Sequence, residues 1–341
     1  PQETEKFFDV LRKMKEDGKS IIIITHKLNE VLAISDRVAI LRKGRSVGVV
    51  ETRTATAQSL TEAMVGRSVS LSIERPEVPL TGDRLTVQEL NCVDHEGVRV
   101  LKDVSFVLHG GEILGVAGVA GSGQRELCEA LSGLQPIKSG HIYHNDGDFS
   151  EDIVGKSPFD IARMGIRSAF VPEDRLGMGL VAGMSMVDNM MLKNYHESKG
   201  LFVDRKKPRM VADELIKRLG IVTPNASTPV RRLSGGNVQK VLLGREINSN
   251  PSVLIAAYPV RGLDINSSYM IYDLLNEQKK KGVAVLYVGE DLDVLMQLCD
   301  RIIVMCGGAI TGVVDPRAVT KEKIGELMMR HENDRSEEGA G

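Results

Sequence analysis

The sequence predicts an α/β fold in which a mostly parallel sheet is covered by helices. Two short apolar runs, Val253–Ala257 and Val283–Val288, have the length of strands that are buried on both faces. The amphipathic stretch from Ser267 to Lys281 separates them, as the crossover helix of a parallel sheet does. A third apolar run, Glu112–Ala117, leads into a glycine-rich loop and another helical segment. Strands and helices therefore alternate along the chain.

Length and composition limit the number of domains and the kinds of partner. The 341 residues exceed what one hydrophobic core usually supports, so we expect more than one domain. The 44 Lys and Arg residues nearly balance the 46 Asp and Glu residues, which makes nucleic acid an unexpected partner. The four cysteines lack the spacing of a metal site, and we expect no metal cluster. No apolar run approaches the about 18 residues of a membrane-spanning helix.

Part of the sequence is repeated at a constant offset of 264 positions. Asp36-Arg37 corresponds to Asp300-Arg301, and Gly48-Val49-Val50 corresponds to Gly312-Val313-Val314, without a gap. Other identities in this register join Asp9, Leu11, Lys15, Gly18, Leu28 and Gly44 to Asp273, Leu275, Lys279, Gly282, Leu292 and Gly308. A repeat of this kind indicates two copies of one structural unit.

The repeat predicts the domain boundaries. We expect residues 1–68 to be the C-terminal part of a first domain and residues 85–331 to be a second, complete one, so that the chain is a fragment of a tandem protein. A short ancillary domain ahead of a single complete domain is the alternative. Residues 69–84 are rich in Pro, Ser and charge, which predicts a linker. The charged end, residues 332–341, predicts a disordered tail.

The glycine-rich loop has the context of a phosphate-binding loop. It contains Gly118, Gly121, Ser122 and Gly123, and lies between a predicted strand and a predicted helix. In such a loop, backbone N–H groups surround phosphates, a Lys neutralises them, and a Ser or Thr hydroxyl ligates magnesium. Here Gln124 and Arg125 replace the Lys and the hydroxyl. Arg125 is unable to bind a metal, although it places a positive charge near a bound phosphate.

Two other strand ends differ from those of an ATP-hydrolysing site. The run that ends at Ala257 and Tyr258 lacks the Asp that holds magnesium and the Glu that polarises water. Taken alone, this segment is better explained as an ordinary buried strand followed by a turn, but it lies shortly after Gln239-Lys240. In the repeat, Glu290 aligns with His26, which follows the predicted strand Ile21–Ile24. Because a His at that strand end hydrogen-bonds the γ-phosphate, we predict His26 as a catalytic residue and the other positions as degenerate.

The motif Leu233–Lys240 is the best preserved part of the sequence. Its residues Ser234, Gly235 and Gly236 offer a hydroxyl and backbone N–H groups that reach a γ-phosphate across an interface. With the glycine loop upstream, this motif resembles the signature of ATP-binding cassette proteins of bacterial simple-sugar and nucleoside importers, the ribose and galactose type. The resemblance covers nearly the whole chain. Glu173, within Val171–Arg175, falls where other cassettes have the glutamine of the Q loop.

This resemblance implies an ABC-type P-loop NTPase domain with an antiparallel β subdomain and a helical subdomain. It also implies two nucleotide sites between head-to-tail cassettes. One site joins His26 and the missing first phosphate loop to Ser234, Gly235, Gly236 and Gln239. The other joins the segment from Gly118 to Arg125, with Glu173, Ala257, Tyr258 and Glu290, to the missing first signature. Asp264 is similar to the D-loop residue, and His95 takes the place of an aromatic ring on adenine.

The resemblance further implies what the intact protein binds and where it acts. ATP is the expected cofactor, with Mg²⁺ at the first site only. Integral membrane permease subunits are the expected partners, with a solute-binding protein reached through them, at the cytoplasmic face of the membrane. The Ala-Ala-Tyr segment and the Gly-Ser-Gly-Gln loop look most like the nucleoside-uptake branch. We expect an ATPase that is inactive as this fragment alone. A translation factor, a DNA-repair ATPase and a nucleotide-binding regulatory clamp are the alternatives.

Overall fold

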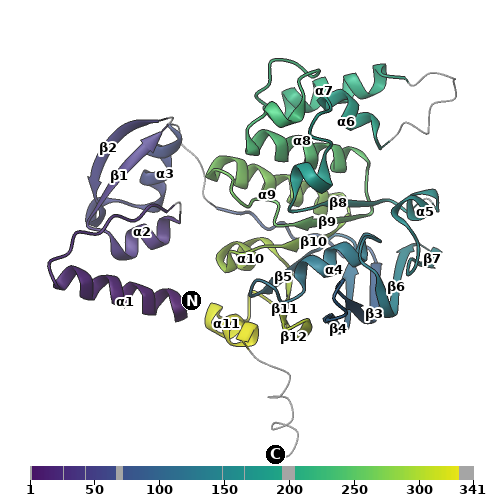
Figure 1. Ribbon diagram of the computed structural model, residues 1–341, viewed down its shortest axis with the longest axis horizontal. Helices are drawn as coiled ribbons and strands as arrows, with labels where there is room; N and C mark the ends of the chain where they lie inside the picture. The colour runs from purple at the N-terminus through teal and green to yellow at the C-terminus, as the bar shows by residue number, and fades with distance from the viewer. Residues whose placement is uncertain are drawn as a thin grey trace, which may run out of the picture. The chain divides into compact units, whose positions relative to one another are not determined.

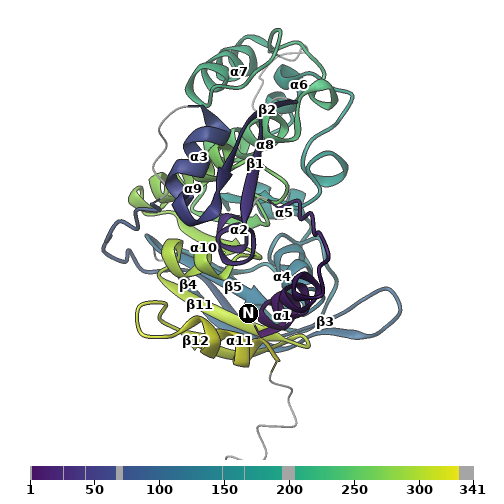
Figure 2. The same ribbon diagram turned by 90° about the vertical axis from the view of Figure 1, so that its left-hand side faces the viewer.

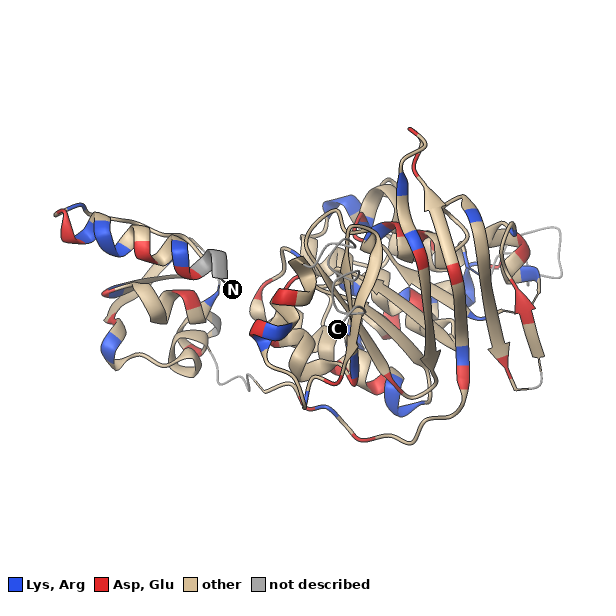
Figure 3. Cartoon of the chain, turned by 90° about the horizontal axis from the view of Figure 1, so that it is seen from below, with Lys and Arg blue, Asp and Glu red and all other residues tan. Residues whose placement is uncertain are grey.

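The computed structural model describes residues 2–25, 27–42, 44–66, 72–147, 149–164, 166–193 and 204–329. The chain divides into two compact units, Pro1–Ser72 and Ile73–Gly341 (Figure 1). In both units basic and acidic residues are interspersed, as the balanced composition predicts (Figure 3). The predicted tail, residues 332–341, lies outside the described residues.

The first unit combines short helices with one antiparallel hairpin. Helix α3 begins with a reciprocal capping box between Thr56 and Ser59 and ends at Gly66, which is in the left-handed conformation. An ion pair of 2.6 Å between Lys15 and Asp36 joins the first helix to the hairpin. The described elements are α1 (Gln2–Glu16), α2 (Leu28–Ile34), β1 (Arg37–Arg42), β2 (Arg45–Glu51), the 3₁₀ turn η1 (Thr52–Thr54) and α3 (Ala57–Val65).

The prediction of a strand at Ile21–Ile24 is wrong. These residues have no regular structure, and the side chains of Ile22 and Ile24 are 92% and 97% exposed. Their counterpart in the second unit, β10 (Ala284–Val288), is hydrogen-bonded on both sides, to β5 and to β9. The described residues of the first unit contain no such neighbours. A strand forms only where its N–H and C=O groups find a partner strand, so the apolar run stays unpaired.

The other elements of the first unit recur in the second at the same offset. Helix α1 corresponds to the greater part of α9 (Ile265–Lys280). The two hairpins even share a register irregularity at the same step, Ile40/Leu41 in one and Val304/Met305 in the other. This agreement supports the prediction that the sequence repeat is a structural repeat. The counterparts of α2, β1, β2 and α3 are α10 (Leu292–Leu298), β11 (Arg301–Cys306), β12 (Ala309–Val314) and α11 (Lys321–Met329).

The second unit is built on a six-stranded sheet in the order β12-β11-β5-β10-β9-β8. Its neighbouring strands are parallel except for the β11–β12 hairpin, so the predicted α/β class is confirmed. Alternate residues of β10 enter two separate cores: Val285 and Tyr287 join the core of α8 (Gly235–Asn248), α9 and α10, whereas Leu286 joins the core of α4 (Gln124–Leu131). The ribbon shows where these helices lie around the sheet (Figures 1 and 2). The remaining central strands are β5 (Ile113–Gly118), β8 (Ser168–Val171) and β9 (Val253–Ala257).

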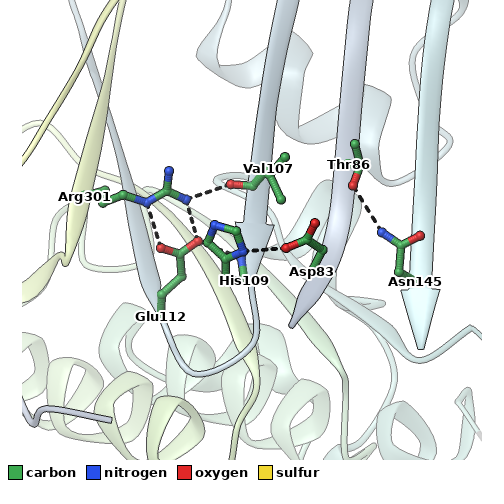
Figure 4. A network of polar contacts seen from close by, with 7 residues as sticks. All are labelled: Asp83, Thr86, Val107, His109, Glu112, Asn145 and Arg301. Atoms are coloured by element: carbon green, nitrogen blue, oxygen red, sulfur yellow. Dashed lines mark hydrogen bonds and ion pairs between the residues drawn. The ribbon is translucent and has the colours of Figure 1, made fainter. Parts of the chain in front are cut away.

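A four-stranded antiparallel sheet, ordered β4-β3-β6-β7, forms the predicted β subdomain. Buried Glu112 fastens it to the main sheet, because its carboxylate accepts a hydrogen bond from the backbone amide of His109, at the end of β4, at 2.6 Å. The same carboxylate accepts hydrogen bonds from Arg301 of β11 at 2.8 and 3.0 Å (Figure 4). Arg301 also donates to the carbonyl of Val107, and His109 lies 2.8 Å from Asp83. The strands are β3 (Asp83–Val93), β4 (Arg99–His109), β6 (Ile137–Asp146) and β7 (Phe149–Asp152), so β3 begins two residues before the predicted start at Leu85.

Short helices between β8 and β9 form the predicted helical subdomain. Helices α6 and α7 of this subdomain pack on each other (Figure 1). Ser185 accepts a hydrogen bond from the Asp188 amide and starts α6. The elements are the π turn η2 (Arg175–Gly179), α6 (Met186–Met191), α7 (Lys206–Arg218) and the 3₁₀ turn η4 (Val230–Arg232). The remaining short helix, α5 (Pro158–Arg163), precedes β8 and joins the core that contains α4.

The predicted linker, residues 69–84, is only in part a free connection. Its residues 69–71 lie outside the described part of the chain, but the segment from Ile73 onward belongs to the second unit. The Arg75 guanidinium donates to the carbonyl of Cys299 at 2.6 Å, beyond the end of α10. The Asn276 amide of α9 donates to the carbonyl of Glu74 at 2.6 Å. Composition alone indicates neither bond.

Candidate nucleotide-binding site

The topology of the main sheet brings the predicted site residues to one edge. Strands β5, β10, β9 and β8 are parallel neighbours, so their carboxyl ends lie side by side. The glycine loop follows β5, Glu173 follows β8, Tyr258 follows β9 and Glu290 follows β10. Residues far apart in the sequence therefore face one region, as the repeat and the motifs predict.

The glycine loop has the backbone form of a phosphate cradle. Gly123 caps helix α4 in the left-handed conformation, at φ 94°. A Cβ at this position would lie 2.7 Å from the carbonyl oxygen of Val100, so only glycine fits. Gly121 is also left-handed, at φ 85°, and the space around its Cα is open. The first N–H groups of α4 have no partner within the helix and are available to an anion.

The Gln124 side chain folds back into the base of this loop. It is 2% exposed, and its amide nitrogen donates to the carbonyl of Val119 at 3.1 Å. A Cβ on Gly118 would lie 2.3 Å from the same nitrogen, which shows how closely the side chain crosses the loop. Gln124 therefore offers a neutral donor where a Lys would offer a charge.

Arg125 takes the position of the metal-binding hydroxyl and turns along α4. Its Nε lies 2.7 Å from the Glu129 carboxylate, one helical turn further on. The hydrogen bond and the charge of Glu129 raise the pKa of Arg125, and Glu173 adds to that effect. The guanidinium is therefore a permanent cation beside the loop and no metal ligand.

An arginine that the motifs did not single out links three of the strand ends. Arg261 follows β9, and its guanidinium forms ion pairs with Glu173 and, at 3.2 Å, with Glu290. It also lies 6.0 Å from the centre of the Tyr258 ring, within the range of a cation–π contact. Arg175 donates to the Arg261 carbonyl. In the sequence, the only sign of this role is that a basic residue, Arg261, follows Ala257 and Tyr258, which replace acidic residues.

The two residues at the end of β9, Ala257 and Tyr258, lack the carboxylates that a hydrolysing site has there. The backbone of Tyr258 is left-handed, at φ 49°. Burial, helped by the negative charges of Glu173 and Glu290 and opposed by Arg261, raises the pKa of the Tyr258 phenol to about 12. The phenol therefore stays protonated at neutral pH and is unable to act as a general base. The methyl group of Ala257 has no oxygen to offer.

The donor set does not fit magnesium, although the loop fits an anion. The two positions that would ligate Mg²⁺ hold the Arg125 guanidinium and the Ala257 methyl group, and a protonated phenol, Tyr258, replaces the Glu that polarises water. Hard divalent cations require oxygen ligands, chiefly carboxylates. Within the described ranges, no group of three or more His, Cys, Asp or Glu side chains is placed to hold a metal ion.

The signature motif lies at the start of α8. Ser234 is the N-cap residue, and its hydroxyl accepts a hydrogen bond from the side-chain Nδ2 of Asn237 at 2.8 Å. The helix begins with two glycines, and a Cβ on Gly236 would lie 3.2 Å from the Ser267 hydroxyl of α9. Asp264 caps α9 by accepting hydrogen bonds from the Ser267 amide and hydroxyl, at 3.0 and 2.8 Å. The predicted signature and the predicted D-loop residue are therefore neighbours.

A search against protein-family models agrees with these motifs. The model described as "ABC transporter" matches residues 101–260, which include the glycine loop, the signature and Tyr258. The nucleoside import ATP-binding protein NupA of Lactococcus lactis is 37% identical over 96% of this chain. The chain is similar to ATP-binding proteins of the ABC transporter family. The predicted resemblance to import ATP-binding proteins is confirmed.

Other relatives of this cassette chain have similar names. The guanosine import ATP-binding protein NupO of Bacillus subtilis is 37% identical over 96% of this chain. The ribose import ATP-binding protein RbsA of Clostridium tetani is 36% identical over 94% of it. The chain spans only 64% of the length of NupA and of NupO, and 62% of that of RbsA.

Solved structures confirm the cassette fold. The crystal structure of the ADP conformation of MJ1267, an ATP-binding cassette of an ABC transporter, superposes with a TM-score of 0.58 at 20% identity. It covers 74% of this chain and all of that one. The dimeric structure of MJ0796, a bacterial ABC transporter cassette, superposes with a TM-score of 0.60 at 21% identity. That match covers 69% of this chain and all of the other.

Two predicted site residues of the cassette, Gln239 and His95, lie away from the edge of the sheet, and a third is not described. His26 falls outside the described residues. The Gln239 side chain is buried in α8, and neither of its amide atoms has a hydrogen-bond partner, so it does not share the exposed surface of Ser234. His95 lies in the exposed turn between β3 and β4. None of the described helices combines the length and the apolar character that crossing a bilayer requires.

Proposed function

We propose that this chain forms part of the ATP-binding subunit of an importer for nucleosides or simple sugars. The observation that carries the proposal is an intact signature at Ser234–Gly236 in a cassette whose own phosphate loop has lost its charged and metal-binding side chains. Such a cassette completes an active site elsewhere and does little hydrolysis at its own loop. The printed names of NupA, NupO and RbsA support nucleoside or ribose import.

The structural repeat supports a tandem arrangement. The first unit repeats the order of elements that closes the cassette in the second unit, and the relatives are longer than this chain. We propose that residues 1–68 end a first cassette, whose phosphate loop and His26 meet Ser234, Gly235 and Gly236. The glycine loop with Gln124 and Arg125 then forms a second, degenerate site. ATP and Mg²⁺ are used for hydrolysis at the first site.

Asymmetric hydrolysis is tested in the complete tandem protein assembled with its permease. We expect His26→Ala to lower ATP turnover by about 10² or more, because a group that stabilises the transition state is lost. Glu290→Ala, at the aligned position, should leave turnover within about threefold of the original, because that site contributes no proton transfer. The measurement is phosphate release at saturating Mg-ATP. Equal losses in the two variants would refute the asymmetry.

The chain alone should not hydrolyse ATP. Each missing charge-stabilising or proton-transfer group lowers the rate by about 10² or more, and the Lys, Asp, Glu and His positions are all replaced. Phosphate release from the purified 341-residue chain with Mg-ATP should therefore equal the blank. Phosphate release above the blank, in the original chain and in Arg261→Met alike, would show that the chain has an active site that its side chains do not suggest.

The partners are tested by copurification from native membranes. We expect the tandem protein to be recovered with integral permease subunits at the cytoplasmic face of the membrane, and through them with a solute-binding protein. Recovery with ribosomes or with DNA would support a translation factor or a repair ATPase instead. The printed names of the relatives favour import.

A further inference from the structure

We infer that the degenerate site binds a nucleoside polyphosphate in its metal-free form, with Arg125 and Arg261 supplying the positive charge that a metal ion supplies elsewhere. Mg²⁺ then weakens the binding. The inference rests on the proposed function only in taking the loop before α4 as a nucleotide site. It adds the chemical form of the ligand and names the residues that select it.

The backbone of the loop still suits an anion. Gly121 and Gly123 keep their left-handed conformations, and helix α4 still directs its first N–H groups toward the loop. Gln124 adds a neutral amide donor at the base of the loop. Together these groups bind phosphate oxygens without any metal ion, because their hydrogen bonds are made to the anion itself.

The surroundings of the loop oppose a divalent cation. A magnesium ion that arrives with ATP would meet the Arg125 guanidinium in place of a hydroxyl and the Ala257 methyl group in place of a carboxylate. The two nearby carboxylates, Glu173 and Glu290, follow β8 and β10, and neither takes the place of the Asp that is missing from the end of β9. A magnesium ion held by the phosphates alone, beside a guanidinium and without a carboxylate ligand from the protein, is disfavoured. The metal-free polyphosphate has no such conflict.

Two arginines are placed to replace the metal. Arg125 and Arg261 are 65% and 54% exposed, so their ion pairs with glutamates are weak and exchangeable. Phosphate oxygens accept paired hydrogen bonds from a guanidinium and compete well with a carboxylate. Arg175 lies close by and donates to the Arg261 backbone, which holds this loop near the end of β8. Without a ligand, Glu129, Glu173 and Glu290 keep the arginines in place.

The test measures equilibrium binding of a fluorescent ATP analogue to the 341-residue chain by anisotropy. We expect the apparent dissociation constant in EDTA to be at least severalfold lower than in millimolar Mg²⁺ at matched ionic strength. Arg261→Met should weaken binding in EDTA by about tenfold to a hundredfold, the value of one charge-assisted hydrogen bond. Arg218→Met is the matched control, because Arg218 is an exposed arginine paired with Glu277 at 2.6 Å, outside this site. It should bind as the original chain does.

Three outcomes would overturn the inference: tighter binding with Mg²⁺, unchanged binding in Arg261→Met, or no binding in either buffer. Circular dichroism of each variant separates a lost ligand contact from lost folding. The importer assignment is tested by a separate experiment, copurification with a permease. Metal-free binding by a protein that never associates with a permease would uphold the site and refute the importer. Association with a permease without metal-free nucleotide binding would uphold the importer and refute the site.

Discussion

The two copies of the repeated segment have similar local structure but very different burial. In the first copy Lys15 pairs with Asp36 at 2.6 Å, and in the second Lys279 pairs with Asp300 at 2.7 Å. The Lys15 side chain is 56% exposed, whereas that of Lys279 is 1% exposed. The difference is that only the second copy adjoins a complete sheet. The local sequence therefore determines the helices, the hairpin and the ion pair. The neighbouring strands determine which side chains of these elements are buried.

The largest effect should come from removing the lysine in each copy. Lys279→Met leaves the Asp300 carboxylate without its buried partner, which costs about 3 to 5 kcal/mol of unfolding free energy. Lys15→Met breaks an exposed pair, worth about 1 kcal/mol or less. Hydrogen exchange read by mass spectrometry reports the two units separately. Equal costs would mean that the first ion pair is buried in solution as well.

A second pair of substitutions tests the missing strand. Leu286→Ala in β10 removes a fully buried side chain and should cost about 2 to 5 kcal/mol. Ile22→Ala, at the corresponding position, should change stability by no more than about 0.5 kcal/mol, because Ile22 is almost completely exposed. The same exchange experiment measures both values. A large cost at Ile22 would show that this apolar run is covered in the intact protein.

These pairs also show what the sequence could predict. The strand–loop–helix context around Gly118–Gly123, the signature helix and the repeat follow from local spacing, and the structure forms each of them. The strand at Ile21–Ile24 was wrong because strand formation depends on partners that local sequence does not encode. The link from Arg261 to Glu173 and Glu290 could not be predicted, because it depends on the order of strands in the sheet.

Acid should lower the stability of the second unit, which contains the buried His144, more than that of the first. Burial, helped by Arg84 and Arg167 and opposed by Asp146, lowers the pKa of His144 to about 4. Because the folded pKa lies below the unfolded value of 6.5, the unfolded second unit binds an extra proton between these values. Its stability is complete above pH 6.5 and falls toward pH 4, by up to about 3 kcal/mol.

The measurement for this pH effect is urea unfolding of the second unit across that range. His144→Phe should remove the extra slope, because no imidazole remains to be protonated. The carboxylates Asp146 and Asp152 do not interfere, since their lowered pKa values place their own titration below this window. A slope that persists in His144→Phe would assign the acid sensitivity to another group.

The smallest effect should come from the hairpin glycines. Comparing the two positions separates the cost of a steric contact from the cost of backbone strain. Gly44 and Gly308 are both left-handed, at φ 76° and 89°, so alanine at either position costs about 1 to 2 kcal/mol of backbone strain. At Gly44 a Cβ would meet nothing within 4 Å, but at Gly308 it would lie 2.6 Å from the carbonyl oxygen of Val100. Gly308→Ala should therefore cost roughly 1 to 3 kcal/mol more than Gly44→Ala, as overpacked sites do. If thermal unfolding shows the same cost at both positions, the contact between the β11–β12 hairpin and β4 does not constrain the second copy. A larger cost at Gly308 would show that the same turn is restricted only where the rest of the cassette packs against it.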